Sequence, residues 1–114
     1  MPDKDKFNLL TILESIEKIF KYSMNFSNAD MFYENQREFD AVMMNFIVIG
    51  EMASRLSENF ININNHIEWT KIRNFRNIVA HNYFGIDAEE VWQIIKNKLP
   101  QLENELHKIL KELD

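Results

Sequence analysis

Residues that break helices are almost absent from this chain. Glycine occurs only at positions 50 and 85, and proline only at positions 2 and 100, in a chain of 114 residues. Because glycine and proline are the strongest markers of turns and loops, their scarcity predicts long helices with few connections. We therefore expect an all-α fold, and residues 1–114 have the length of a single domain.

The apolar pattern of the first half has the helical period, with spacings of three and four residues. It predicts one helix over residues 5–23 and a second over roughly 30–59, capped at its start by Ser27 or Asp30. Residues 61–65 (ININN) read as a loop. The residues expected to face the core are Phe7, Leu10, Leu13, Ile16 and Phe20 in the first helix, and Phe32, Phe39, Val42, Met43, Phe46, Ile49 and Leu56 in the second.

The second half predicts two further helices. One begins near Ile67 and ends near His81 or Asn82, and the other follows Asp87, whose side chain is expected to cap it. Pro100 should kink this last helix or divide it in two. The residues of the third helix expected to face the core are Trp69, Ile72, Phe75, Ile78 and Val79. Four amphipathic helices with short links favour an up-and-down four-helix bundle whose last helix is kinked or split.

Charge and composition narrow the possible functions. The formal net charge of −5 argues against broad, sequence-independent binding to nucleic-acid backbones, so any contact with a polyanion must be local. The chain has no cysteine, which excludes disulfides and thiolate metal sites. No apolar run has the length of a membrane span and the first ten residues do not resemble a signal peptide, so we expect a soluble, cytoplasmic protein.

Arginine, asparagine, histidine and tyrosine side chains lie close together between apolar residues in the stretch RNFRNIVAHNYFG, residues 73–85. At ~100° per residue on a helix, Arg76, Ala80 and Tyr83 share one stripe, and Asn77 and His81 share the neighbouring one. Arg73 and Lys71, a little earlier, add to the same basic cluster, which contains no interleaved carboxylate. The small Ala80 at the centre of this polar face leaves room for a ligand.

Arg76 and His81 are five residues apart, so their side chains need not meet within one helix. Two arrangements would bring them together. Either the helix ends at His81 and the backbone turns, or a second copy of the chain supplies its own pair across a two-fold axis.

This set of side chains suits phosphate chemistry. Histidine exchanges protons near neutral pH, and arginine stabilises charge that develops on a phosphorus centre. His66, His81 and His107 lack the spacing of metal ligands, so we expect no metal and no cofactor. Phosphate cleavage without a metal favours a substrate that carries its own nucleophile, as RNA does in its 2′-hydroxyl. Taken alone, a set of this kind more often forms a capping and interhelical hydrogen-bond cluster than an active site.

A resemblance to a known family favours the interpretation as an active site. The segment RNIVAHNY contains the R-x4-H-x-Y signature of the HepT-like toxins in the HEPN superfamily. The segments IGEMASRLSENF, IEWTKIRNFRN and YFGIDAEEVWQIIKNKLPQL also resemble the corresponding parts of that family. The similarity spans about residues 30–103.

The resemblance implies a homodimer of small helical bundles whose signature motifs share a composite cleft, acting as a metal-independent endoribonuclease. Arg76 and His81 would be catalytic, with Asn77 and Arg73 in support. The implied partner is a minimal nucleotidyltransferase antitoxin of the MntA type, which would silence the toxin by transferring AMP to Tyr83. The alternative function is a non-catalytic nucleotide- or substrate-binding subunit of a two-component nucleotidyltransferase.

Overall fold

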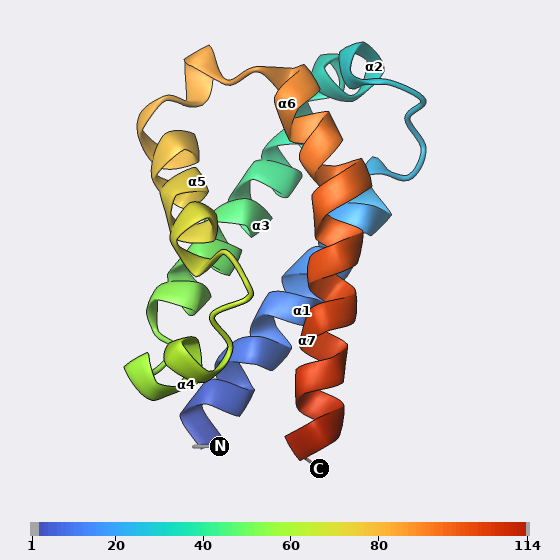
Figure 1. The fold of residues 1–114 in the computed structure, drawn as a ribbon. Coiled ribbons are helices and arrows are strands. Elements are labelled where there is room, and N and C mark those ends of the chain that lie inside the picture. Colours follow the sequence, from blue (N-terminus) through green and yellow to red (C-terminus); the bar gives the residue numbers. More distant parts are fainter. Residues whose placement is uncertain (1–2, 114) are drawn as a thin grey trace.

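Long helices run alternately up and down along one axis in the computed structural model, which describes residues 3–113 (Figure 1). The helical segments are α1 (Asp3–Ser23), α2 (Ala29–Glu34), α3 (Gln36–Ser54), α4 (Glu58–Ile63), α5 (Trp69–His81), the 3-10 turn η1 (Tyr83–Gly85), α6 (Ala88–Gln93), the π-helical η2 (Ile94–Lys98) and α7 (Leu99–Leu113). There is no β-strand within this described part of the chain. The predicted all-α bundle is therefore confirmed.

Helix α3 lies at the centre of the bundle and packs against α1 on one side and α5 on the other. Every residue predicted for the core face of the second helix is buried, from Phe32 to Leu56. The aromatic rings of Phe32, Phe39 and Trp92 pack together where α2, α3 and α6 meet. Apolar burial on both sides of α3 makes it the scaffold against which α5 is placed.

The stripe predicted for the first helix is only partly right. Leu13 and Ile16 are buried, but Phe7 and Leu10 are 66% and 49% exposed. The buried stripe of α1 consists of Leu9, Ile12, Leu13, Ile16 and Ile19. Both stripes have helical spacing, and contact with α3 and α7 selects the one that faces inward.

The predicted second helix, over roughly residues 30–59, is divided among α2, α3 and the start of α4. Asn35 has non-helical backbone angles (φ −93°, ψ 81°) and ends α2, where its side-chain amide donates to the Met31 carbonyl at 2.8 Å. Asparagine side chains compete for backbone hydrogen bonds in this way and so interrupt helices. The cap of α2 is Asn28, which accepts from the Met31 amide, and not Ser27 or Asp30 as predicted.

The connection after α3 also differs from the prediction, because residues 58–63 form α4 and only the end of the expected loop is irregular. Ser57 caps this helix through the Phe60 amide. The buried Asp5 of α1 accepts hydrogen bonds from the Ser57 amide at 2.8 Å and the Ser57 hydroxyl at 2.6 Å. A long-range contact thus stabilises a helix that its own sequence signals weakly.

The last helix is continuous but contains a wide turn. Asp87 caps α6 as predicted, accepting from the amides of Glu89 and Glu90. The π-helical η2 then leads directly into α7, with Pro100 in its first turn. Proline removes a backbone donor and collides with the preceding turn, and a π turn relieves that collision, so the last helix is divided into joined segments, one of the two predicted outcomes. No helix in residues 3–113 has the length and apolarity to span a membrane.

Candidate active site

Arg76 points from α5 towards α3, where its guanidinium meets a carboxylate. Its Nη1 donates to Oε1 of Glu51 at 2.8 Å, and its Nε donates to the side-chain oxygen of Asn77 at 3.2 Å. The arginine side chain is only 22% exposed, against 45% for the glutamate. Its second terminal nitrogen, Nη2, has no hydrogen-bond partner among residues 3–113 and remains available to an incoming anion.

Gly50 lets α5 approach α3 closely at this point. A Cβ atom added at Gly50 would lie 2.3 Å from Cβ of Arg76, well inside any normal contact distance. Gly50 therefore marks a close crossing of α3 and α5. The sequence did not identify Glu51, the next residue, as the partner of Arg76, because nothing local links positions 25 residues apart.

His81 is the last residue of α5 and lies exposed, as does Asn77 one turn earlier. The imidazole makes no hydrogen bond or ion pair with the described residues. Asn82 ends the helix by donating its amide to the Ile78 carbonyl at 2.9 Å. Arg76 is held against α3 while His81 faces solvent, so one chain alone does not bring the predicted catalytic pair into contact.

Two neighbours of His81 are apolar and exposed. Ile78, three residues before it, is 50% exposed, and Phe84, three residues after it, is 97% exposed. The prediction that Ile78 faces the core is therefore wrong, because Val79 occupies the buried stripe. Arg73, on the flank of the same helix, donates to the Thr70 hydroxyl at 3.3 Å.

Tyr83 is partly buried in η1, and its hydroxyl is held at the start of α3. The hydroxyl donates to Oδ1 of Asp40 and accepts from Nε2 of Gln36 at 2.8 Å. Gln36 also donates to both carboxylate oxygens of Asp40 at 3.2 Å, so the three side chains form a closed cluster. Burial, helped by the Asp40 carboxylate, raises the pKa of Tyr83 to about 12. The contact of this tyrosine is thus with α3 and not with Arg76.

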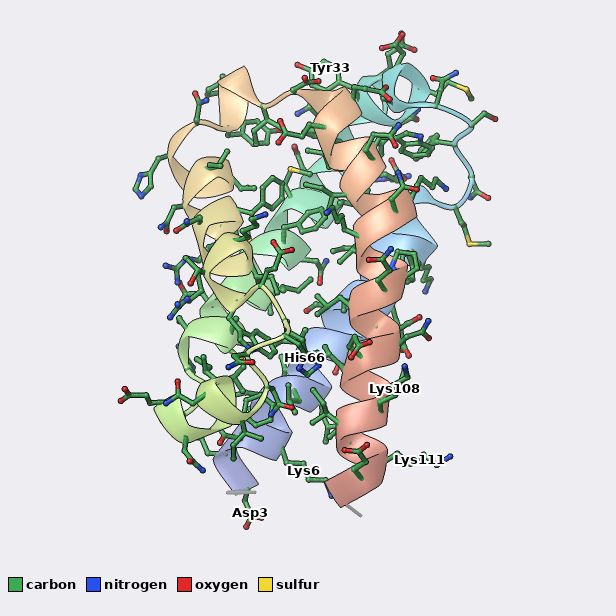
Figure 2. The ribbon with its side chains drawn as sticks, viewed as in Figure 1. Asp3, Lys6, Tyr33, His66, Lys108 and Lys111 are labelled. Atoms are coloured by element: carbon green, nitrogen blue, oxygen red, sulfur yellow. The ribbon has the colours of Figure 1, made fainter. Side chains whose placement is uncertain are left out.

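The other two histidines lie outside this region. His66 lies in the loop before α5 (Figure 2). Its Nε2 is 3.1 Å from Oε2 of Glu105 on α7. His107 is exposed on α7. No three side chains of metal-ligating type gather within residues 3–113.

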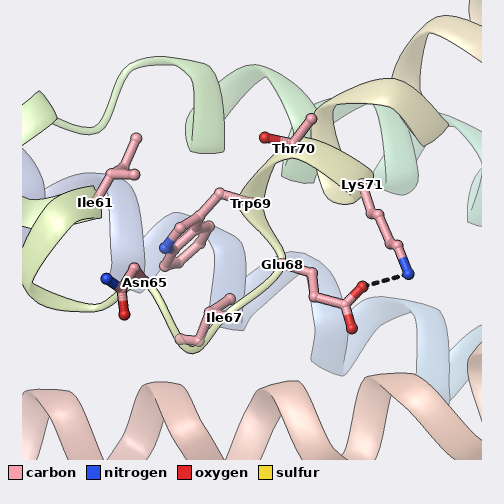
Figure 3. Close-up of a pocket in the computed structure, with 7 residues that line it drawn as sticks. All are labelled: Ile61, Asn65, Ile67, Glu68, Trp69, Thr70 and Lys71. Atoms are coloured by element: carbon pink, nitrogen blue, oxygen red, sulfur yellow. Dashed lines mark ion pairs between the residues drawn. The ribbon is translucent and has the colours of Figure 1, made fainter.

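A shallow hollow of about 360 Å³ lies at the opposite end of α5 (Figure 3). It is lined by Ile61, Asn65, Ile67, Glu68, Trp69, Thr70 and Lys71. Its charged members neutralise each other, since Nζ of Lys71 lies 2.8 Å from Oε2 of Glu68. Their hydrogen bond lowers the pKa of Glu68 and raises that of Lys71. Lys71, a member of the predicted basic cluster, is thus paired with a carboxylate. None of the predicted catalytic residues lines this hollow.

The fold and these side chains define a class: a small all-α bundle with arginine, asparagine and histidine gathered on the helix that packs against its central helix. A model of the Ribonuclease HepT-like family matches residues 12–109. The chain belongs to this family and is a HepT-like ribonuclease domain of the HEPN superfamily.

Three relatives illustrate the match. A Methanocaldococcus jannaschii protein named "Gamma-glutamylcyclotransferase and putative RNase" is 37% identical over 96% of this chain and 49% of its own length. A second protein of that organism, named "Putative RNase", is 34% identical over 100% of this chain and 94% of its own. A Thermococcus cleftensis protein named "Probable ribonuclease HepT" is 27% identical over 97% of this chain and 100% of its own. The chain spans about half of the first relative and nearly all of the other two. No solved structure is significantly similar to it.

Proposed function

We propose that this protein is a metal-independent endoribonuclease in which Arg76 and His81 are catalytic. The chain belongs to a ribonuclease family, and the proposal depends on how the side chains of α5 are arranged in it. There, an arginine bonded to Glu51 stands five residues, about 1.4 helical turns, from an exposed histidine. Residues 1–114 would act as one HEPN-like domain, since the family match covers most of them.

The reaction uses the nucleophile of the substrate. His81 accepts the proton of the ribose 2′-hydroxyl, whose oxygen attacks the adjacent phosphorus as the bond to the 5′-oxygen breaks. Nη2 of Arg76 donates to a phosphate oxygen and stabilises the charge of the transition state. Asn77, bonded to Nε of the arginine, and Arg73 support the phosphate site. The 5′-oxygen takes a proton from solvent water as it leaves, so the products are a 2′,3′-cyclic phosphate and a 5′-hydroxyl end.

A second copy of the chain completes the site in this proposal. Support comes from the separation of Arg76 and His81 within one chain, and from the exposed Ile78 and Phe84 on either side of the histidine. Apolar side chains of this kind gain free energy when a partner covers them. A two-fold axis beside α5 would bring each arginine towards the histidine of the other copy.

Cleavage of a defined RNA in the presence of a chelator tests the activity. We expect His81→Ala and Arg76→Ala each to lower the rate by about 10²- to 10⁴-fold. His107→Ala is the matched control and should match wild type. An RNA with a single 2′-deoxy sugar at the cleaved position should be resistant. Cleavage that requires magnesium, or that occurs equally well in the deoxy substrate, contradicts the mechanism.

Mixing two inactive variants tests the shared site. If Arg76 of one copy acts with His81 of the other, a mixed dimer of R76A and H81A chains contains one intact pair. Random exchange makes about half of the dimers mixed, so on the order of a quarter of wild-type activity should return. Native mass spectrometry verifies that exchange has occurred. Mixed dimers without activity would exclude a pair formed between copies, and a monomer in solution would exclude the dimer itself.

We further propose that the ribonuclease is a toxin whose cognate MntA-type nucleotidyltransferase antitoxin transfers AMP to Tyr83. The phenol oxygen would form a bond to the α-phosphorus of ATP, pyrophosphate would leave, and Asp40 is placed to accept the phenol proton. Each AMP adds negative charge two residues along the chain from His81, which repels the phosphates of RNA.

Co-expression with a candidate partner tests this regulation. Tyr83→Phe should cleave RNA at close to the wild-type rate but should carry no AMP-sized adduct in intact-mass analysis, and it should escape neutralisation. Tyr33→Phe, a change at an exposed tyrosine of α2, is the control and should still be modified. An adduct that persists in Tyr83→Phe, or full activity in the modified protein, would refute the proposed control.

A further inference from the structure

Glu51 faces the one arginine of α5 that the proposed reaction requires. Its carboxylate is the sole protein group outside α5 that bonds the Arg76 guanidinium within residues 3–113, at 2.8 Å. The contact joins the middle of α5 to the end of α3, 25 positions earlier in the chain. Because α3 is the central helix, the carboxylate is attached to the most extensively packed element of the bundle.

The backbone beside Glu51 is adapted to this contact. All three atoms nearest to a Cβ atom added at Gly50 belong to the Arg76 side chain, at 2.3, 3.0 and 3.1 Å. The arginine stem therefore lies directly over Gly50, and its head turns to the neighbouring carboxylate. A side chain with four rotatable bonds is thus confined along its stem and anchored at its head.

The two contacts of the Arg76 guanidinium leave some of its N–H donors unused. A guanidinium has five N–H donors in a rigid plane. Glu51 takes one at Nη1 and Asn77 takes the one at Nε, which sets the direction in which Nη2 points. An arginine with a fixed plane stabilises a transition-state charge without reorganising first. A free arginine would have to lose its rotamer entropy on binding.

The Glu51 carboxylate should help catalysis by orienting Arg76, but it should weaken the binding of RNA before the reaction. A negative charge close to Arg76 partly neutralises it and repels the RNA backbone. If Glu51 is removed, its positioning effect therefore predicts a lower turnover, and its neutralising effect predicts a higher one. If positioning dominates, turnover falls although RNA binds as well or better. If neutralisation dominates, binding and turnover both rise.

We infer that Glu51 is a positioning residue that, together with Gly50, orients Arg76 for catalysis. The inference rests on the proposed ribonuclease function. It adds to that function a residue of α3 that does not touch the substrate but acts through the arginine.

Steady-state cleavage by Glu51→Ala and Glu51→Gln tests the inference. For Glu51→Ala we expect kcat to fall by about 10- to 100-fold, the loss typical of a misplaced catalytic group, with KM unchanged or lower. The Gln variant keeps an oxygen that accepts the Nη1 hydrogen bond, so it should recover most of the lost turnover. Glu38→Ala is the matched control, since Glu38 pairs with Arg37 on the same helix at 3.3 Å.

Each other outcome overturns the inference. Turnover that rises in both Glu51 variants means that the carboxylate only masks the arginine. A Gln variant as impaired as the Ala variant means that the charge or a proton transfer matters, and not the hydrogen bond. Unchanged turnover per folded molecule, with a lower Tm, means that the pair only stabilises the fold. Cleavage by wild type and its loss in H81A are measured alongside, so a failure of the proposed function itself is recognised separately.

Discussion

Gly50→Ala offers a quantitative test of the α3–α5 crossing. The new methyl carbon would lie 2.3 Å from Cβ of Arg76, which is close to the helix backbone and cannot swing aside. The helices must therefore separate, and overpacking of this kind costs about 1–3 kcal/mol. Alanine is favoured over glycine in a helix by about 0.5–1 kcal/mol, which offsets part of the loss. We expect a net destabilisation of about 1–2 kcal/mol, or a fall in Tm of roughly 4–10 °C.

Introducing Gly50→Ala into two Arg76 variants shows whether the clash with Arg76 causes the loss of stability. Arg76→Ala keeps the Cβ atom, so Gly50→Ala should remain destabilising there. Arg76→Gly removes all three of the atoms nearest to the new methyl group, so Gly50→Ala should become neutral or stabilising.

Urea unfolding at one fixed protein concentration measures these differences, because association of subunits would otherwise shift the midpoints. An equal loss of stability in the Arg76→Gly background would refute the proposed clash. So would a Gly50→Ala protein as stable as wild type.

Three further predictions follow from other contacts. Because its pKa is raised, Tyr83 should ionise well above the ordinary pKa of a tyrosine, and its contribution to stability is complete below about pH 10 and is lost as the pH rises towards about 12. Ultraviolet absorbance during a pH titration, compared between wild type and Tyr83→Phe, follows this phenolate, and a midpoint near pH 10 would contradict the prediction. Asp40→Asn should lower the pKa of Tyr83 in the same titration, but not to the ordinary value, because burial is the larger cause. Asp5→Ala should destabilise the fold by about 1–3 kcal/mol in urea, since it leaves both donors of Ser57 without a partner; an unchanged midpoint would show that water replaces the carboxylate.

Local features of the sequence were enough to predict several elements. The first helix was expected at residues 5–23 and begins two residues earlier, and the third ends at His81 as expected. Asp87 caps the last helix as predicted, and every residue predicted to face the core from the second helix is buried. These features depend on contacts within a few residues, such as caps and helical spacing, so the sequence displays them directly.

Periodicity did not decide which face of a helix turns inward. Ile78 and Val79 are adjacent and apolar, yet only Val79 is buried. Phe7 and Leu10 have the spacing of a core stripe but are exposed. A helix with apolar residues on two faces buries the one that its neighbours cover, and that choice depends on packing between helices.

By itself the sequence determined the class of fold and the helix that carries the candidate site, because few breakers and a compact motif are local properties. The partners of that motif come from the tertiary structure. Glu51 meets Arg76 across 25 positions, and Asp40 meets Tyr83 across 43. Carboxylates of this kind are spread along the chain and resemble ordinary surface residues. Only the packing of α5 against α3 selects the two that hold an arginine and a tyrosine of the motif.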